Sequence, residues 1–262
     1  MKVWKRSLPV WLLTLVMLLT ACGTPSQPDQ PDGTETWREA YEETGAYLQA
    51  QTAPTVGSIG GEWAVIGLSR AGLLSDETAQ SYEQTVEDYV KQAGSVRLHH
   101  AKSTENSRTI LGLTAAGYNA ANVAGVDLTA GLTDMAYLRA QGTNGPIWAL
   151  IALDCHGYDI PQCADGEEQT TREGLVAEIL SYQCSDGGWA LMGDESDVDM
   201  TAMALTALAP YQEETDVKAA VDAALTYLSD AQQADGGFMS WGAANSESCA
   251  QVIVALTALG ID

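Results

Sequence analysis

The sequence predicts an all-α protein built from helical hairpins, and three observations support this prediction. Segments with an apolar stripe at helical spacing alternate with segments that are apolar or small almost all round. A short motif, Gln-x-x-Asp-Gly-Gly-aromatic, recurs at the ends of the striped segments. Runs with the alternation typical of β-strands are scarce. Two helical segments repeated along a chain are the signature of a repeat architecture.

The motif is clearest from Gln183 to Trp189 and from Gln232 to Phe238, and a worn copy stands at 141–146. Glutamines that close successive striped segments stand at 51, 92, 141, 183 and 232, so the steps between them are 41, 49, 42 and 49 residues. A period in the forties fits one helical hairpin per repeat.

Each residue type in the clearest copy has an expected structural role. Gly187 and Gly188 take positive φ at little cost, so they are expected to turn the chain sharply. Trp189 offers a large flat surface that can wedge between helices. Ser196 or Asp197 can cap the helix that follows.

From Trp37 onward the pattern predicts ten helices in five pairs. The striped first members lie near 37–51, 76–93, 128–140, 171–183 and 216–231. The apolar second members lie near 62–71, 105–116, 146–155, 198–209 and 247–259. A helix that is apolar all round is buried, so the second members are expected to form an inner layer that the first members surround.

The first 21 residues carry three cations and then an apolar run, which predicts a secretory signal too short to be an ordinary membrane-spanning helix. Its end, Leu19 to Gly23, resembles the bacterial lipoprotein signal, which implies cleavage before Cys22 and a lipid on its sulfur. The alternative is a plain signal peptide with a chance cysteine. Residues 22–36 are polar and rich in proline, so they are expected to be a disordered tether before a domain at 37–262. The protein is therefore expected at the extracytoplasmic face of a bacterial cell membrane, which it would touch through its lipid anchor alone.

The charge excludes several classes of partner. The chain holds 12 Lys and Arg against 35 Asp and Glu, a formal charge of −23. Removal of the signal takes away three cations, which leaves 9 − 35 = −26. Binding to nucleic acid or to anionic lipid through charge is therefore not expected. A diphosphate substrate would need a bridging metal.

The repeated motif and the helix start Asp197-Val198-Asp199-Met200-Thr201-Ala202 resemble the terpene cyclase and prenyltransferase superfamily over about 37–262. This resemblance implies an α/α toroid. The same toroid serves squalene-hopene cyclases, protein prenyltransferase β subunits, complement-like thioester domains and a domain of cobalamin carriers. A full toroid has six inner helices and only five are predicted here, so either the ring is open or the chain is a truncated product.

The resemblance assigns a candidate catalytic acid. Cyclases of this family use Asp-x-Asp-Asp-Thr-Ala, in which the middle aspartate protonates the substrate. Asp199 matches that acid, Asp197 matches the first one, and Met200 replaces the third. An acid of that strength needs hydrogen-bonded neighbours in a dry pocket, and Met200 provides none. The other interpretation is that Asp197 and Asp199 cap and charge a helix start.

Metal and thioester chemistry have weaker support. None of the three histidines fits the zinc-ligand pattern of the prenyltransferases, and Cys155, His156 and Cys163 could bind metal or, as we favour in an exported protein, form a Cys155–Cys163 disulfide. Cys184 and Cys249 could pair or stay free. Gly-Cys-Gly-Glu-Gln is absent from the sequence, which excludes a thioester. No metal or other cofactor is expected.

A ligand site is expected where the starts of parallel inner helices would meet. Trp63, Trp148 and Trp241 stand near three of these starts, and Asp197 and Asp199 open a fourth. Aromatic faces and a few carboxylates around one opening favour a binding site for a neutral or amphipathic small molecule, or for a protein partner. The alternative is that each tryptophan packs within its own hairpin. A binding or interaction module is the favoured function, and a terpenoid cyclase using Asp199 is the runner-up.

Overall fold

The computed structural model describes residues 33–51, 55–57, 59–240 and 242–261. Within them the protein is all-α, as predicted, with ten α-helices and one pair of two-residue strands. The chain divides into two units, one that ends at Tyr47 and one that begins at Leu48. The predicted domain boundary at residue 37 stays a prediction.

The first unit is represented by most of helix α2 (Gly33–Gln51). The sequence predicts a tether as far as residue 36, whereas helix α2 already begins at Gly33. Its large apolar side chains stay in contact with solvent: Trp37 is 54%, Tyr41 51% and Tyr47 64% exposed.

The helices of the second unit fall where the sequence predicts them. The elements that follow α2 are η1 (Ile59–Trp63), α3 (Ala64–Arg70), α4 (Asp76–Ala93), α5 (Thr104–Ala115), η2 (Leu128–Leu132), α6 (Met135–Arg139), α7 (Asn144–Asp154), α8 (Arg172–Ser181), α9 (Val198–Leu208), η3 (Ala209–Tyr211), α10 (Thr215–Ala231), β1 (Met239–Ser240), β2 (Ala243–Ala244) and α11 (Ser246–Ala258). One predicted helix, 128–140, is divided into η2 and α6. Asp134 explains the break, because its Oδ1 accepts a hydrogen bond from the Ala136 amide and so starts a new helix.

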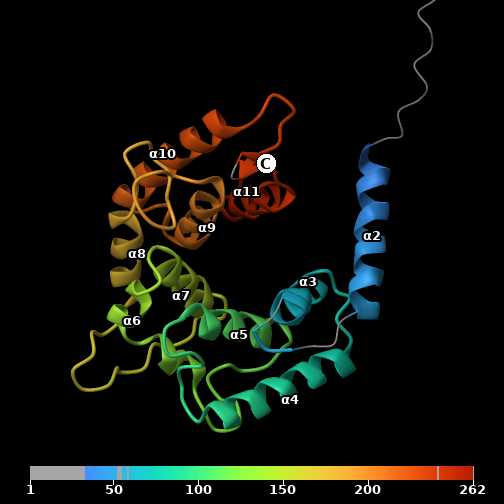
Figure 1. The fold of residues 1–262 in the computed structure, drawn as a ribbon, viewed down its shortest axis with the longest axis vertical. Coiled ribbons are helices and arrows are strands. Elements are labelled where there is room, and N and C mark those ends of the chain that lie inside the picture. Colours follow the sequence, from blue (N-terminus) through green and yellow to red (C-terminus); the bar gives the residue numbers. More distant parts are fainter. Residues whose placement is uncertain (1–32, 52–54, 58, 241, 262) are drawn as a thin grey trace, which may run out of the picture. The chain divides into compact units, whose positions relative to one another are not determined.

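The predicted apolar helices follow one another as a row of packed helices, α3, α5, α7, α9 and α11, which we call the central row. The striped helices flank it: α4 packs on α5, α6 and α8 pack on α7, and α10 packs on α9 (Figure 1). The chain thus alternates between the flank and the row, which is the arrangement that the two kinds of sequence segment predict.

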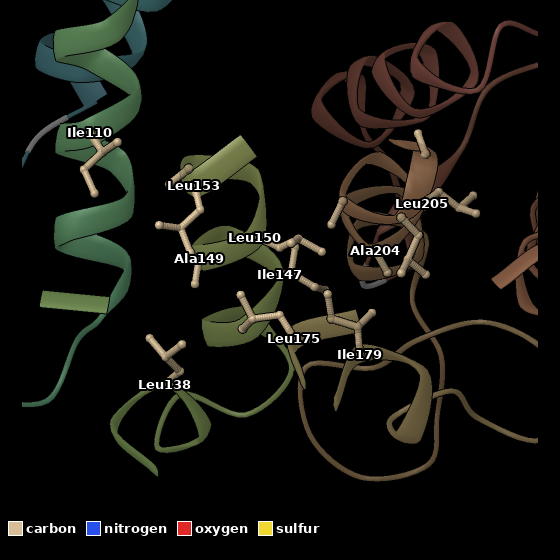
Figure 2. Close-up of a cluster of buried hydrophobic side chains, with 14 of the residues drawn as sticks. Ile110, Leu138, Ile147, Ala149, Leu150, Leu153, Leu175, Ile179, Ala204 and Leu205 are labelled. Atoms are coloured by element: carbon tan, nitrogen blue, oxygen red, sulfur yellow. The ribbon is translucent and has the colours of Figure 1, made fainter. Parts of the chain in front are cut away.

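The middle of the core lies around α7. Ile147 and Leu150 of this helix are inaccessible to solvent, and so are Leu175 and Ile179 of α8. Figure 2 shows side chains from α5 to α9 gathered around α7. Burial of this kind is the main favourable term for the fold, at about 25 cal/mol for each Å² of apolar surface removed from water.

Side-chain contacts show that α5, α7 and α9 begin at the same end of the row. Gln141, three residues before α7, accepts hydrogen bonds through Oε1 from Ser103 Oγ at 3.0 Å and from the Thr104 amide at 2.9 Å, at the start of α5. Thr143, at the start of α7, donates through Oγ1 to the Ala190 carbonyl at 2.8 Å, in the loop before α9. These three helices therefore run in the same direction.

The outer members of the row begin at that end too. Glu62, directly before α3, has Oε2 3.3 Å from Arg108 Nε in the second turn of α5. Ser240, in the hairpin before α11, lies with its Oγ 3.5 Å from Asp199 Oδ2 in the first turn of α9. All five helices of the row are therefore parallel, and we call their common end the N-terminal end of the row.

The repeat motif is explained by a closed turn. Gln183 Nε2 donates to the Gly187 carbonyl at 2.8 Å and to the Ala220 carbonyl of α10 at 2.9 Å. Asp186 Oδ1 accepts from the Gly188 amide at 3.1 Å. Gly187 has φ +92°, a backbone conformation that favours glycine. A β-carbon there would also lie 2.8 Å from the Ala223 carbonyl oxygen, so the available space excludes a larger residue as well.

The second copy repeats these bonds. Gln232 Nε2 donates to the Gly236 carbonyl at 2.9 Å, Asp235 Oδ1 accepts from the Gly237 amide at 3.0 Å, and Gly236 has φ +86°. The aromatic residue that ends the copy, Phe238, is buried. The motif is therefore a local structural unit that ends a flanking helix and leads the chain back to the row.

The last helix of the row, α11, is covered on one face only. Val252 and Ala255 are buried against the core, whereas Ile253 is 64% and Val254 51% exposed. A central helix such as α7 packs against a helix of the row on each side, whereas α11 packs within the row against α9 on one side. Among the described residues, no helix is both long and apolar enough to cross a membrane.

Candidate ligand-binding site

Two of the predicted binding residues meet in the structure. Trp63, directly before α3, and Trp148, in the second turn of α7, lie edge to face, with ring centroids 5.3 Å apart and an interplanar angle of 63°. Trp63 is 39% exposed and Trp148 is half-buried. The pair is therefore partly open to solvent near the N-terminal end of the row.

The central row curves from α3 to α11, as Figure 1 shows. Trp63 precedes α3 and Trp148 belongs to α7, and α5 packs against both helices. The two rings therefore meet next to α5, near the N-terminal end of the row.

Asp197 caps the start of helix α9, which is one of the two roles that the sequence allows for it. Its backbone is extended, and its Oδ1 accepts a hydrogen bond from the Met200 amide at 2.8 Å, so it is the N-cap of α9. Burial raises the pKa of this carboxyl, and the Met200 amide acts in the opposite direction by favouring the charged form. The carboxyl is therefore engaged in starting the helix.

The carboxyl of Asp199, the candidate acid, is held less firmly by hydrogen bonds than the carboxyl of Asp197. It is half-buried in the first turn of α9, and its Oδ2 lies 3.5 Å from Ser240 Oγ, a long hydrogen bond. Its Oδ1 is buried without a hydrogen-bond partner in the described part of the chain. A buried acceptor without a partner is uncommon, so this oxygen marks Asp199 as a candidate functional group. Met200, which replaces the acid of the cyclase motif, is buried in the core.

The remaining predicted site residues divide into two groups. Trp241 and Cys22 lie outside the described residues. Cys155 and Cys163 are described, and both thiols are free in this structure, so the disulfide between them stays a prediction. Cys155 Sγ faces the Ala152 carbonyl at 3.2 Å, and Cys163 Sγ faces the Glu167 carbonyl at 3.6 Å, so each thiol has a backbone acceptor instead.

Cys184 and Cys249, whose pairing the sequence left open, are free as well. No group of three or more His, Cys, Asp and Glu residues within the described ranges could hold a metal ion. The alternative of a metal at Cys155, His156 and Cys163 therefore finds no supporting geometry there.

A buried ion pair that the sequence does not reveal joins Glu62, the residue before Trp63, to Arg108. The Glu62 side chain is inaccessible to solvent, and its Oε1 accepts from the Gly57 amide at 2.8 Å while its Oε2 faces Arg108 Nε at 3.3 Å. Arg108 also pairs with Glu105 one turn earlier on α5. A glutamate next to a glycine-rich segment gives no sign of burial, and its partner stands 46 residues away, so only the fold reveals the pair.

No protein-family model, curated protein or solved structure matches the chain. The case for a site therefore depends on the geometry described above.

The two aspartates can be separated by their effects on stability. Asp197→Ala is expected to lower the free energy of unfolding by about 1 kcal/mol, within the 0.5–2 kcal/mol range for a lost N-cap. Asp199→Asn should cost less, because it removes only a charge near the helix dipole, worth about 0.3–1 kcal/mol. Urea unfolding of both variants measures the difference, and equal losses would contradict the assignment of Asp197 as the cap.

Proposed function

We propose that this protein is a binding module with an open α/α toroid, and that it holds a neutral or amphipathic small molecule at the N-terminal end of the central row. The observation that carries the proposal is the edge-to-face pair of Trp63 and Trp148 near the N-terminal end of the row, with Trp63 39% exposed. Concave aromatic surface with few polar groups is the usual lining of a small-molecule site.

Parallel helices and a bent row support the toroid part of the proposal. A toroid requires inner helices that run in one direction and turn progressively around an axis. The shared N-terminal end of α3, α5, α7, α9 and α11 is consistent with the first requirement, and the curve of the row in Figure 1 supports the second. Contacts between α11 and α3 that would close a ring are not among the substantial helix contacts of the described residues, so we propose an open form.

The electrostatics of this end favour a ligand without strong charge. Each helix start carries about half a positive charge from its dipole, and five starts gather here. Glu62, Glu105, Asp199 and Glu247 lie at these starts and compensate the dipoles. Opposite contributions reduce the local field, so apolar contact and single hydrogen bonds would decide which ligand binds.

The proposal is tested with squalene, farnesol and cyanocobalamin as probes. We expect at least one to raise the melting temperature, since a ligand at 100 times its Kd stabilises the folded state by about 2.7 kcal/mol. Trp63→Leu and Trp148→Leu should each weaken that binding by about tenfold, because an aromatic contact is worth roughly 0.5–1.5 kcal/mol beyond its area.

Trp37→Leu is the matched control, because this tryptophan is 54% exposed in α2 and belongs to the first unit. It should leave the affinity unchanged. A ligand whose affinity stays the same in both Trp63→Leu and Trp148→Leu would bind elsewhere, and the proposed site would then be wrong.

A second candidate function is terpenoid cyclisation with Asp199 as the general acid. The observation that favours it is the buried and unpartnered Oδ1 of Asp199. The substitution of Met200 for the neighbouring acid weighs against it. Incubation with squalene and analysis of the products separates the two candidates: cyclic products that disappear in Asp199→Asn would establish catalysis and overturn the binding-only proposal.

The expected location belongs to the same proposal. Lipid attachment at Cys22 would hold the module at the extracytoplasmic face of a bacterial membrane, where an amphipathic ligand can be supplied. Metabolic labelling with a palmitate analogue tests this, with Cys22→Ser as the control that should lose the label.

A further inference from the structure

A groove between α8 and α10 lies apart from the tryptophan pair, on the flanking helices. It has a volume of about 340 Å³ and is lined by Glu173, Val176, Ala177, Leu180, Tyr211, Glu214, Thr215, Asp216 and Val217. The two helices are in contact. This volume lies at the lower end of the range for small-molecule sites, which is about 300–1,000 Å³.

The floor of the groove is apolar. Val176 of α8 and Val217 of α10 are buried and face the groove from its two sides, and Leu180 continues the surface one turn further along α8. Tyr211 contributes a half-buried ring whose hydroxyl is already engaged, because it donates to Asp154 Oδ2 at 2.8 Å. The ring is therefore held in place, and a ligand would meet carbon surface on this floor.

The rim of the groove carries one sign of charge. Glu173, Glu214 and Asp216 are exposed, and the lining includes no lysine, arginine or histidine. The nearest arginine on α8, Arg172, is bound to Asp154 through Nε at 2.7 Å. The formal charge of the chain, −23, adds a long-range attraction for cations.

We propose that this groove binds a small organic cation with an apolar body. The ammonium group would lie at the rim between Glu173, Glu214 and Asp216. The apolar body would lie over Ala177, Leu180 and the Tyr211 ring, above the buried Val176 and Val217. The acids alone or the apolar floor alone would not define a ligand. Together they fit a molecule that carries both an ammonium group and an apolar body. The inference is independent of the function proposed for the N-terminal end of the row.

The test is a calorimetric titration with 2-phenylethylammonium and with its neutral isostere, 2-phenylethanol. We expect the cation to bind saturably and the neutral molecule to bind at least fivefold more weakly. The double variant Glu173→Gln/Glu214→Gln should raise the Kd of the cation by about tenfold at low salt, because it removes two of the three negative charges at the rim. Ala177→Trp should abolish binding, because residue 177 is exposed and its enlarged side chain would fill the groove without disturbing the core.

Glu213→Gln is the matched control, since Glu213 is an exposed acid next to the groove but outside its lining. It should leave the Kd unchanged. Equal binding of the alcohol and the ammonium, or unchanged binding in Ala177→Trp, would overturn the proposal. A lysine-rich peptide that binds in a manner sensitive to Ala177→Trp, while 2-phenylethylammonium does not bind, would also overturn it in favour of a protein partner.

Discussion

Replacement of Trp189 by alanine is expected to lower the free energy of unfolding by about 3–5 kcal/mol, the usual cost of emptying the space of a buried tryptophan. Trp189 is inaccessible to solvent, and its Nε1 donates to the Ile179 carbonyl at 2.7 Å. Its backbone carbonyl accepts from the Asp197 amide at 3.0 Å, so the residue joins the end of α8 to the start of α9. The substitution would also leave the Ile179 carbonyl without this donor.

Urea unfolding followed by circular dichroism measures this loss, and Trp37→Ala is the control. Trp37 is 54% exposed, so its substitution should change the stability by less than about 0.5 kcal/mol. A loss below about 1.5 kcal/mol in Trp189→Ala would show that the aromatic residue of the motif does not hold the hairpin in the way that we describe.

Arg108→Met is expected to cost about 3–5 kcal/mol, because removal of one partner of a buried ion pair leaves the other charge in a poorly solvated site. The Glu62 side chain has no exposure, and the side chain of Arg108 is 19% exposed. The Gly57 amide remains as a donor to Glu62 but supplies no full charge. Since Glu62 precedes Trp63, we also expect weaker binding at the tryptophan pair.

The double variant Arg108→Met/Glu62→Gln shows whether the cost comes from the charge. It should recover most of the lost stability, since replacing both members of a buried pair is often neutral. The exposed pair of Lys91 and Glu87 gives the comparison: Lys91→Met should cost less than about 1 kcal/mol. Failure of the double variant to recover stability would assign the loss to packing of the arginine stem.

The helices could be predicted from the sequence because their signals are local. The stripe on α10, with Val217, Val221 and Leu228 buried, follows helical spacing, and the glycine pair before Trp189 marks a turn by its backbone freedom alone. The division of α6 from η2 was missed because Asp134 competes as a cap within a pattern that otherwise continues.

The site was predicted in part. Trp63 and Trp148 were placed together because the starts of parallel helices meet, and their ring contact confirms that they are neighbours. The thiols of Cys155 and Cys163 are free in this structure, so their pairing stays a prediction, and closeness in sequence alone does not set the direction of side chains. The groove between α8 and α10 could not be foreseen, because its walls come from separate repeats whose relative position depends on the tertiary packing.

The half-covered helix α11 has a consequence for how the protein comes apart. In an array where each helix is stabilised chiefly by its immediate neighbours, resistance to opening is graded. Helix α7 has neighbours on both sides and would open last, whereas α11 leaves Ile253 and Val254 in water and would fray first. Thermal unfolding would then begin at α11 and proceed towards α7, and the backbone hydrogen bonds around Ile147 would be the last to break.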